Sequence, residues 1–248
     1  MIKDLQWISS LKDFERLRNK FKVSTVICLN MNTWSVAHKN ANYKEIFEKS
    51  FVLCDGFWAS KLARMLGVRV DLFAGPDFFM KEMSSENKHK HLVLGATQNK
   101  LEGVKEYLRV QGVRKEVFVE SLPFCNVADF NYHEIASNII LADVDLVWVV
   151  LGAPKQEYFS SKLAEILRKL QTNSSNCISI VAVGAVVDFY SISSKVSRAP
   201  LLYQNFGLEW LWRLRQQPWK TFKRIMNELS SIPIILIKEL LHDRNNNN

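Results

Sequence analysis

The sequence has no apolar run long enough to cross a membrane as a helix. A spanning helix needs about 20 consecutive apolar residues, and the closest approach here, IPIILI at 232–237, is far too short. The amino-terminal region is interrupted by Lys3, Asp4, Lys12 and Asp13, so it lacks the apolar core of a secretory signal. These absences predict a cytoplasmic protein, or one that attaches to a membrane without crossing it.

Cysteine is scarce, and it shows no metal-binding pattern. Cys28, Cys54, Cys125 and Cys177 lie in or beside apolar stretches, and no two form a C-x-x-C pair. This placement favours buried free thiols over disulfides or a zinc site. The five histidines also lack ligand spacing, and the sequence contains no dinucleotide fingerprint, phosphate loop, serine-hydrolase elbow or zinc-protease motif. We therefore expect neither a metal nor a cofactor.

The bulk composition is that of a globular protein with a basic surface. Of the 248 residues, 48% are apolar, enough for a sizeable core, and 23% are charged. The formal net charge of +8 indicates an anionic partner. Nucleic acid, a membrane surface and phosphate-bearing substrates all fit that charge, and composition does not choose among them.

Short apolar runs alternate with stretches of helical spacing. The expected strands are 25–29, 51–54, 91–95, 117–119, 145–151 and 177–183, and the expected helices are 42–49, 57–66, 101–111, 132–141 and 156–170. Alternation of this kind produces parallel sheets, whose buried strands are apolar along their whole length. The sequence therefore predicts an α/β core with a largely parallel sheet.

The character of the chain changes after a polar loop at 190–200. The following segment is aromatic and basic, and it has no acid between 211 and 226. Its apolar residues recur at helical spacing, and Pro218 is expected to divide it into two helices. We predict a core at 1–200, a basic amphipathic helical appendage at 201–244 and a disordered tail at 245–248. Such helices lie on anionic membranes; packing on the core or in a homo-oligomer interface is the open alternative.

Ligands of open parallel sheets bind at the carboxyl ends of the strands, and several polar residues follow predicted strands here. Asn30 and Asn32 follow the first strand, and Asp55-Gly56 follows the second. Asp55 fits two roles equally well: an N-cap of the next helix, or a general base facing a substrate hydroxyl.

The stretch VVLGAPKQEYF at 149–159 is the most informative of these strand ends. Gly152 permits a turn or a close approach to a ligand. Lys155, Gln156 and Glu157 then cluster where a helix begins, which favours anion binding. A capped helix with a solvated first turn explains the same residues. Another strand end, VGAVVDFYS at 183–191, offers Gly184 for close approach and Asp188 for a sugar hydroxyl, or for a turn cap.

Five segments together resemble one protein family. CDGFWASKLARMLG, LGAPKQEYF, VGAVVDFYS, RAP and GLEWLWRLRQQP occur in the order and spacing of the WecG/TagA/CpsF glycosyltransferases, family GT26, and the resemblance covers roughly 25–226. It implies a Rossmann-like core and metal-independent, inverting transfer from a UDP-sugar, such as UDP-N-acetylmannosamine or a related hexose. The implied acceptor is a polyprenyl-diphosphate-linked saccharide at the inner face of a bacterial plasma membrane. The implied membrane contact is 208–241.

The resemblance also assigns residues. Asp55 matches the family's proposed catalytic base, Gln156 a substrate-contacting glutamine, and Asn30 the asparagine of a T-x-N segment. The other matches are Asp77 of AGPD, Arg213, and Lys220 and Lys223 where appendage arginines are common. The sequence departs from the family at Cys28, Asn32 and Leu72, where threonine, glutamate and arginine are usual.

Two other functional classes remain open at this stage. A non-catalytic scaffold of a polysaccharide assembly complex would bind membranes without transferring sugar. A nucleic-acid-binding module would use the positive charge, but the sequence contains no homeodomain, RRM or zinc-finger pattern. We therefore expect no nucleic-acid partner.

Overall fold

The structure is a computed structural model that describes residues 1–171, 176–184, 186–194 and 196–246. Seven strands of the described residues form one sheet in the order β1-β3-β2-β7-β6-β4-β5, and every pair is parallel. The strands are β1 (Gln6–Ile8), β2 (Val23–Leu29), β3 (Phe51–Cys54), β4 (His91–Gly95), β5 (Val117–Ser121), β6 (Leu146–Val150) and β7 (Ile178–Ala182). The predicted α/β class with a parallel sheet is confirmed.

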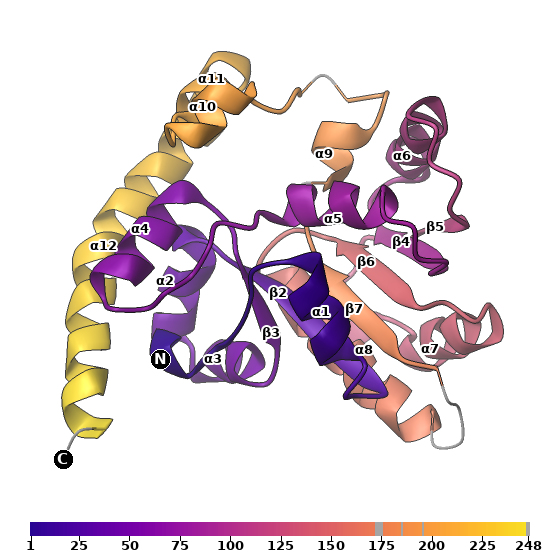
Figure 1. Cartoon of the computed structure of the whole chain (residues 1–248), viewed down its shortest axis with the longest axis horizontal. Coiled ribbons are helices and arrows are strands. Elements are labelled where there is room, and N and C mark those ends of the chain that lie inside the picture. The colour runs from indigo at the N-terminus through magenta and orange to yellow at the C-terminus, as the bar shows by residue number, and fades with distance from the viewer. Residues whose placement is uncertain (172–175, 185, 195, 247–248) are drawn as a thin grey trace.

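Helices cover both faces of the sheet (Figure 1). One face packs against α1 (Leu11–Arg18), α5 (Gly75–Met83), α6 (Gln98–Val110) and α9 (Val186–Tyr190). The other packs against α2 (Met31–Lys39), α3 (Ala41–Glu48), α4 (Phe57–Met65), α7 (Tyr132–Leu141) and α8 (Lys155–Leu170). Because side chains alternate along a strand, Trp148 of β6 reaches the first face while its neighbours Val147 and Val149 reach the second.

The expected helices and strands occur within a few residues of their predicted bounds, and α7 has the bounds that were expected. Sequence reasoning missed β1, α1, α2, α5 and α9. The helix α2 shows why: its sequence MNTWSVAHK mixes polar and apolar residues without a clear stripe. A capping box starts it, in which Asn30 Oδ1 accepts from the Thr33 amide and Thr33 Oγ1 accepts from the Asn30 amide.

The carboxyl-terminal segment forms α10 (Leu201–Asn205), α11 (Glu209–Gln216) and α12 (Pro218–Asn246). Pro218 is the first residue of α12, so the predicted division into two helices at this proline is confirmed. Of the predicted disordered tail, 245–246 continue α12, and 247–248 lie outside the described residues. The long α12 runs down one edge of the molecule beside α2 (Figure 1). Among the described residues, no helix combines the length and the apolarity that crossing a bilayer requires.

A buried carboxylate holds α12 against the core. Glu239 is 2% exposed, and its Oε2 accepts from the Met1 amino group at 3.1 Å and from the Ile2 amide at 3.3 Å. Its Oε1 lies 3.0 Å from Trp34 Nε1 and 2.9 Å from His38 Nε2. Burial alone would raise the pKa of Glu239, but these donors outweigh burial and hold the pKa at about 2.

Candidate active site

Asp55 lies where the ends of β3 and β2 meet. Its backbone amide donates to the Leu29 carbonyl at 2.9 Å, which sets its half-buried side chain beside Asn30. The N-cap of α4 is Gly56, at a φ of +115°, and no side chain caps this helix. The capping role considered for Asp55 is therefore not observed, and the positive φ accounts for the glycine at 56.

The charges around Asp55 come from the appendage and from the loop before it. Burial raises the pKa of Asp55, and repulsion by Glu209 raises it further, while Arg213 and Arg198 lower it. Arg213 donates to Glu209 at 2.8 Å and stacks over the Phe189 ring at 4.7 Å. The half-buried carboxylate at position 55 thus lies within the field of two arginines and one glutamate.

A third arginine belongs to the same group. Arg224 of α12 pairs with Glu228 at 3.3 Å. Burial lowers its pKa, and repulsion by Arg213 lowers it further, while Asp55 raises it. Sequence reasoning named Arg213 but missed Arg198 and Arg224. The sequence signal for Arg198 was the RAP segment that contains it, and the signal for Arg224 was its position next to Lys223.

Asp77 positions one of these arginines. Its two carboxylate oxygens accept from Arg198 Nη1 at 2.6 Å and from Nη2 at 2.7 Å, a bidentate pair. Arg198 Nη1 also donates to the Tyr190 hydroxyl at 3.2 Å. Asp77 had been assigned to substrate binding, and this pairing supports an indirect role, in which it fixes the direction of the guanidinium.

Gln156 and Glu157 form a buried polar pair at the start of α8. Gln156 Oε1 accepts from the Gly152 amide at 3.2 Å, and Gln156 Nε2 donates to Glu157 Oε1 at 2.8 Å. Glu157 is fully buried and its Oε2 makes no well-formed hydrogen bond, so burial raises its pKa. The first turn of α8 is therefore not solvated, contrary to one of the two explanations drawn from its sequence.

Gly184, after β7, has a structural reason for lacking a side chain. A Cβ at this position would lie 2.9 Å from Gln156 Oε1, and its φ is +46°. Gly152 has a φ of +83°, but a Cβ there would meet nothing within 4 Å. Both glycines thus have left-handed backbone, and only Gly184 also makes room for the glutamine.

We expect Gly184→Ala to destabilise the protein by about 2–3 kcal/mol, since it adds displacement of Gln156 to the strain of a left-handed alanine. The matched control is Gly152→Ala, for which we expect only the strain, about 1 kcal/mol. Urea unfolding of both variants measures the difference. Equal losses would mean that the glutamine does not constrain position 184.

Several residues predicted for the site face elsewhere. The Lys155 ammonium bonds the Cys125 carbonyl and lies 4.9 Å from the Phe130 ring centre. Asp188 pairs with Lys100 at 2.6 Å. Asn32 and Lys223 are exposed, and the Lys220 side chain lies outside the described part of the chain. Leu72 is also exposed, so the positive charge near Asp55 comes from the three arginines and not from the segment around position 72.

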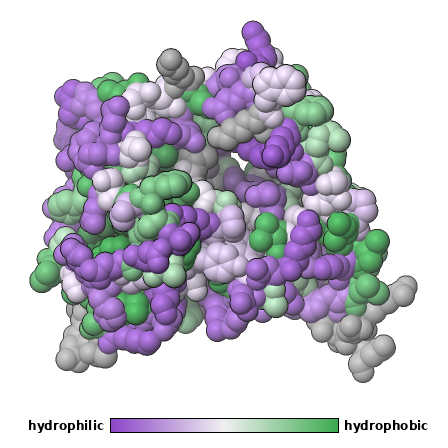
Figure 2. Space-filling view, turned by 180° about the vertical axis from the view of Figure 1, so that it is seen from behind, coloured by the Kyte–Doolittle hydropathy of each residue, from purple (hydrophilic) through white to green (hydrophobic). Residues whose placement is uncertain are grey.

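The group at Asp55 combines parts suited to group transfer. It has a half-buried carboxylate in the field of arginines, and the start of α8, which carries Gln156, lies at the same carboxyl edge of the sheet. Seen from behind, the surface is hollowed between the appendage and the core, and mostly hydrophilic side chains surround the hollow (Figure 2). Such a site can accept a proton from a hydroxyl and hold a polyanionic leaving group.

Comparison with known proteins agrees with this chemistry. The sequence profile of the "Glycosyl transferase WecG/TagA/CpsF family" matches residues 2–246. Two similar proteins are named N-acetylglucosaminyldiphosphoundecaprenol N-acetyl-beta-D-mannosaminyltransferase. The one from Bacillus subtilis (strain 168) is 27% identical over 229 residues, covering 90% of this chain and 82% of the relative. The one from Bacillus spizizenii is 25% identical over 227 residues, covering 90% and 81%.

Proposed function

The chain is a glycosyltransferase of the WecG/TagA/CpsF family, and we propose that it moves a sugar from a UDP-sugar to a polyprenyl-diphosphate-linked saccharide. The names of its relatives favour N-acetylmannosamine as the sugar and an N-acetylglucosaminyl diphospholipid as the acceptor. The observation that carries the proposal is the half-buried Asp55 at the carboxyl edge of the sheet, in the field of Arg198 and Arg213, with a further interaction with Arg224 of α12.

In the proposed reaction Asp55 is the general base. Its carboxylate takes the proton of the acceptor hydroxyl as that oxygen attacks the anomeric carbon and the bond to the UDP leaving group breaks, with inversion. The pKa of Asp55, raised by burial, makes it a stronger base than an exposed aspartate. In this proposal the three arginines stabilise the charge that develops on the diphosphate. Gln156, buried beside Gly184, is assigned to a substrate contact.

Arg213→Gln is expected to move the acidic limb of the pH–rate profile to higher pH. Arg213 lowers the pKa of Asp55, so without it Asp55 is protonated at a higher pH and stops acting as a base there. Glu209 raises that pKa, so Glu209→Gln is expected to move the limb to lower pH. The measurement is kcat/KM against pH. Shifts in the same direction for both variants would exclude Asp55 as the group that sets the limb.

The appendage supports a membrane location for this reaction. One side of α12 carries Ile235 and Glu239, which are buried. The opposite side is the apolar face of α12, made of exposed residues mostly at three- and four-residue spacing: Trp219, Phe222, Met226, Leu229, Ile234, Ile237, Leu240 and Leu241. Green side chains mark the edge along α12 in Figure 2. We propose that this face contacts an anionic membrane and that residues 208–241 form the docking surface.

The test is a transfer assay with a panel of UDP-sugars and a short-chain polyprenyl-diphosphate N-acetylglucosamine, with and without EDTA, following UDP release. Release with one donor, unaffected by EDTA, would support the proposal and identify the sugar. If no donor releases UDP, with this acceptor or with others of the same class, the result would favour a non-catalytic scaffold.

A further inference from the structure

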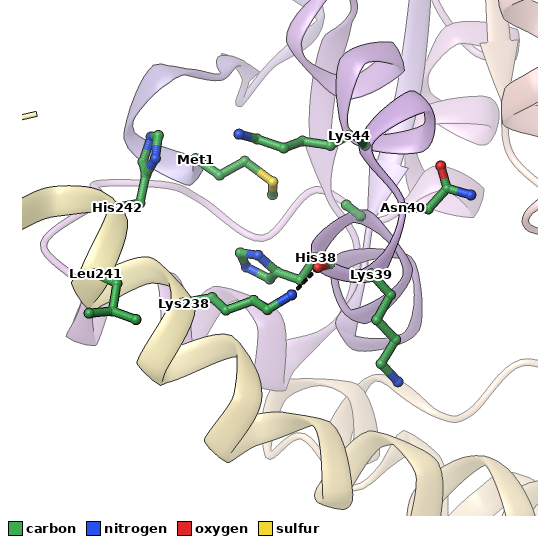
Figure 3. Close-up of a pocket in the computed structure, with 10 residues that line it drawn as sticks. Met1, His38, Lys39, Asn40, Lys44, Lys238, Leu241 and His242 are labelled. Carbon is green, nitrogen blue, oxygen red and sulfur yellow. Dashed lines mark hydrogen bonds between the residues drawn. The ribbon is translucent and has the colours of Figure 1, made fainter. Parts of the chain in front are cut away.

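A basic pocket lies between α2, α3 and α12, on the side of the appendage that holds Glu239 (Figure 3). Its volume is about 480 Å³. The residues lining it are Met1, Ala37, His38, Lys39, Asn40, Ala41, Lys44, Lys238, Leu241 and His242, which include three lysines and two histidines but no aspartate or glutamate. A pocket with this lining is suited to an anion.

The cations of the pocket come from two sides. Lys44 of α3 points across the cavity toward Met1 and His242, and Lys238 of α12 points toward His38 (Figure 3). The Lys238 ammonium bonds the His38 carbonyl. Lys39 also borders the pocket, but its side chain points away from the cavity (Figure 3).

Carboxylates near the pocket are already engaged by other groups. Glu239 is buried beneath the pocket and bonded by Met1, Ile2, Trp34 and His38. Asp4 lies 3.1 Å from His242. Glu48 pairs with Lys44 at 3.2 Å, but both side chains are partly exposed, and an ion pair of this kind contributes little. A phosphate entering the pocket can therefore recruit Lys44 at small cost.

We propose that this pocket binds the phosphate of an anionic phospholipid. The pocket adjoins the apolar face of α12 through Leu241, which lines the cavity and is 53% exposed. The neighbouring Ile237 and Leu240 are 58% and 54% exposed. When Lys44 and Lys238 hold the phosphate of a lipid, the acyl chains of that lipid lie along the apolar face of α12. The inference rests on the membrane docking proposed above.

The pocket is separate from the candidate active site. Lys238 and Arg224 are 14 positions apart on α12, which corresponds to about 20 Å of helix. A lipid bound at Lys238 would hold the far end of α12 on the bilayer, while the end carrying Arg224 remains with Asp55. The pocket is then an anchor for the appendage and not a substrate subsite.

The test is co-sedimentation of the full chain with phosphatidylcholine vesicles, with and without phosphatidic acid. We expect the wild type to prefer the vesicles with phosphatidic acid. Lys44→Gln is expected to weaken that binding about fivefold, the effect of one lysine near an anionic surface. The matched control is Lys105→Gln, which removes the same charge from α6, outside the pocket and across the molecule from α12; it is expected to change binding less than twofold.

The outcomes separate the pocket from the other proposals. Equal binding by the wild type and both variants would overturn the pocket while leaving membrane docking intact. A wild type that binds neither vesicle would overturn the docking and the lipid anchor together, but not the transferase activity, which is assayed with a short-chain acceptor and no vesicles. Inorganic phosphate provides a second arm, followed by the NMR signals of the histidine rings. Phosphate binding that saturates and is weakened by Lys44→Gln, together with vesicle binding that Lys44→Gln leaves unchanged, would mean that the site binds free phosphate. The lipid assignment would then be wrong.

Discussion

Asp55→Asn is expected to lower the rate of sugar transfer by about 10²–10⁴-fold, the usual contribution of a general base. The amide has the shape of the carboxylate and can keep its place beside Asn30, but it cannot accept the acceptor's proton. Burial raises the pKa of Asp55, which means that the ionised carboxylate is held at a cost in the folded protein. The fold is therefore expected to keep its thermal midpoint while losing activity. The measurement is UDP release under single-donor conditions, alongside a thermal melt.

The control for Asp55 is the neighbouring carboxylate. Glu209 lies in the same electrostatic environment but pairs with Arg213. Glu209→Gln is expected to retain transfer within about tenfold of the wild type, a loss smaller than that of a missing base. If Asp55→Asn retained as much activity as Glu209→Gln, Asp55 would not be the base.

The largest effect on stability is expected at Glu239. Glu239→Gln keeps the shape of the side chain but removes the charge that faces the Met1 amino group and His38 in a buried site. Removing one partner of a buried ion pair typically costs about 3–5 kcal/mol. Since those partners belong to the core and Glu239 to α12, the loss is expected to release this end of the helix. Urea unfolding, together with hydrogen exchange of the α12 amides, measures both effects.

The contribution of Glu239 depends on pH in a defined direction. Its pKa is about 2 in the folded protein against an ordinary value of 4.5. A depressed carboxylate pKa stabilises the folded state above the unfolded value, and this stability is lost as the pH falls from about 4.5 toward 2; it amounts to at most about 3 kcal/mol. Glu239→Gln is expected to lose this acid dependence.

The exposed carboxylate Glu165 is the matched control. It pairs with Lys162 at 2.9 Å and with Lys169 at 2.6 Å on the surface of α8. We expect Glu165→Gln to leave both the unfolding curve and α12 exchange unchanged, because exposed ion pairs contribute little. Equal losses from the two substitutions would mean that Glu239 does not hold α12 in place.

Much of the fold follows from local pattern. The apolar runs that became β2, β3, β4, β6 and β7 were visible because both faces of the sheet are covered, so every residue of those strands except His91 is apolar or small. The short β1 and the mixed helix α2 lack such a pattern, and contacts distant in sequence stabilise them. Glu239 illustrates this: it reaches Met1 and Trp34 across more than 200 positions.

The candidate site, like the fold, could be predicted from the sequence only in part. The sequence by itself determined the α/β class and placed Asp55, Asn30 and Gln156 at strand ends, because parallel strands bring their carboxyl ends to one edge. The resemblance then gave Asp55 its expected role as a base.

Only the tertiary structure decided which cations accompany Asp55. Lys155 is held by the Cys125 carbonyl, while Arg198 and Arg224 join Arg213 near Asp55. Lys223 and Arg224 are neighbours in the sequence, but successive helical residues point about 100° apart. The one that interacts with Asp55 therefore depends on how α12 is rotated against the core, and the buried residues of α12, Glu239 among them, fix that rotation.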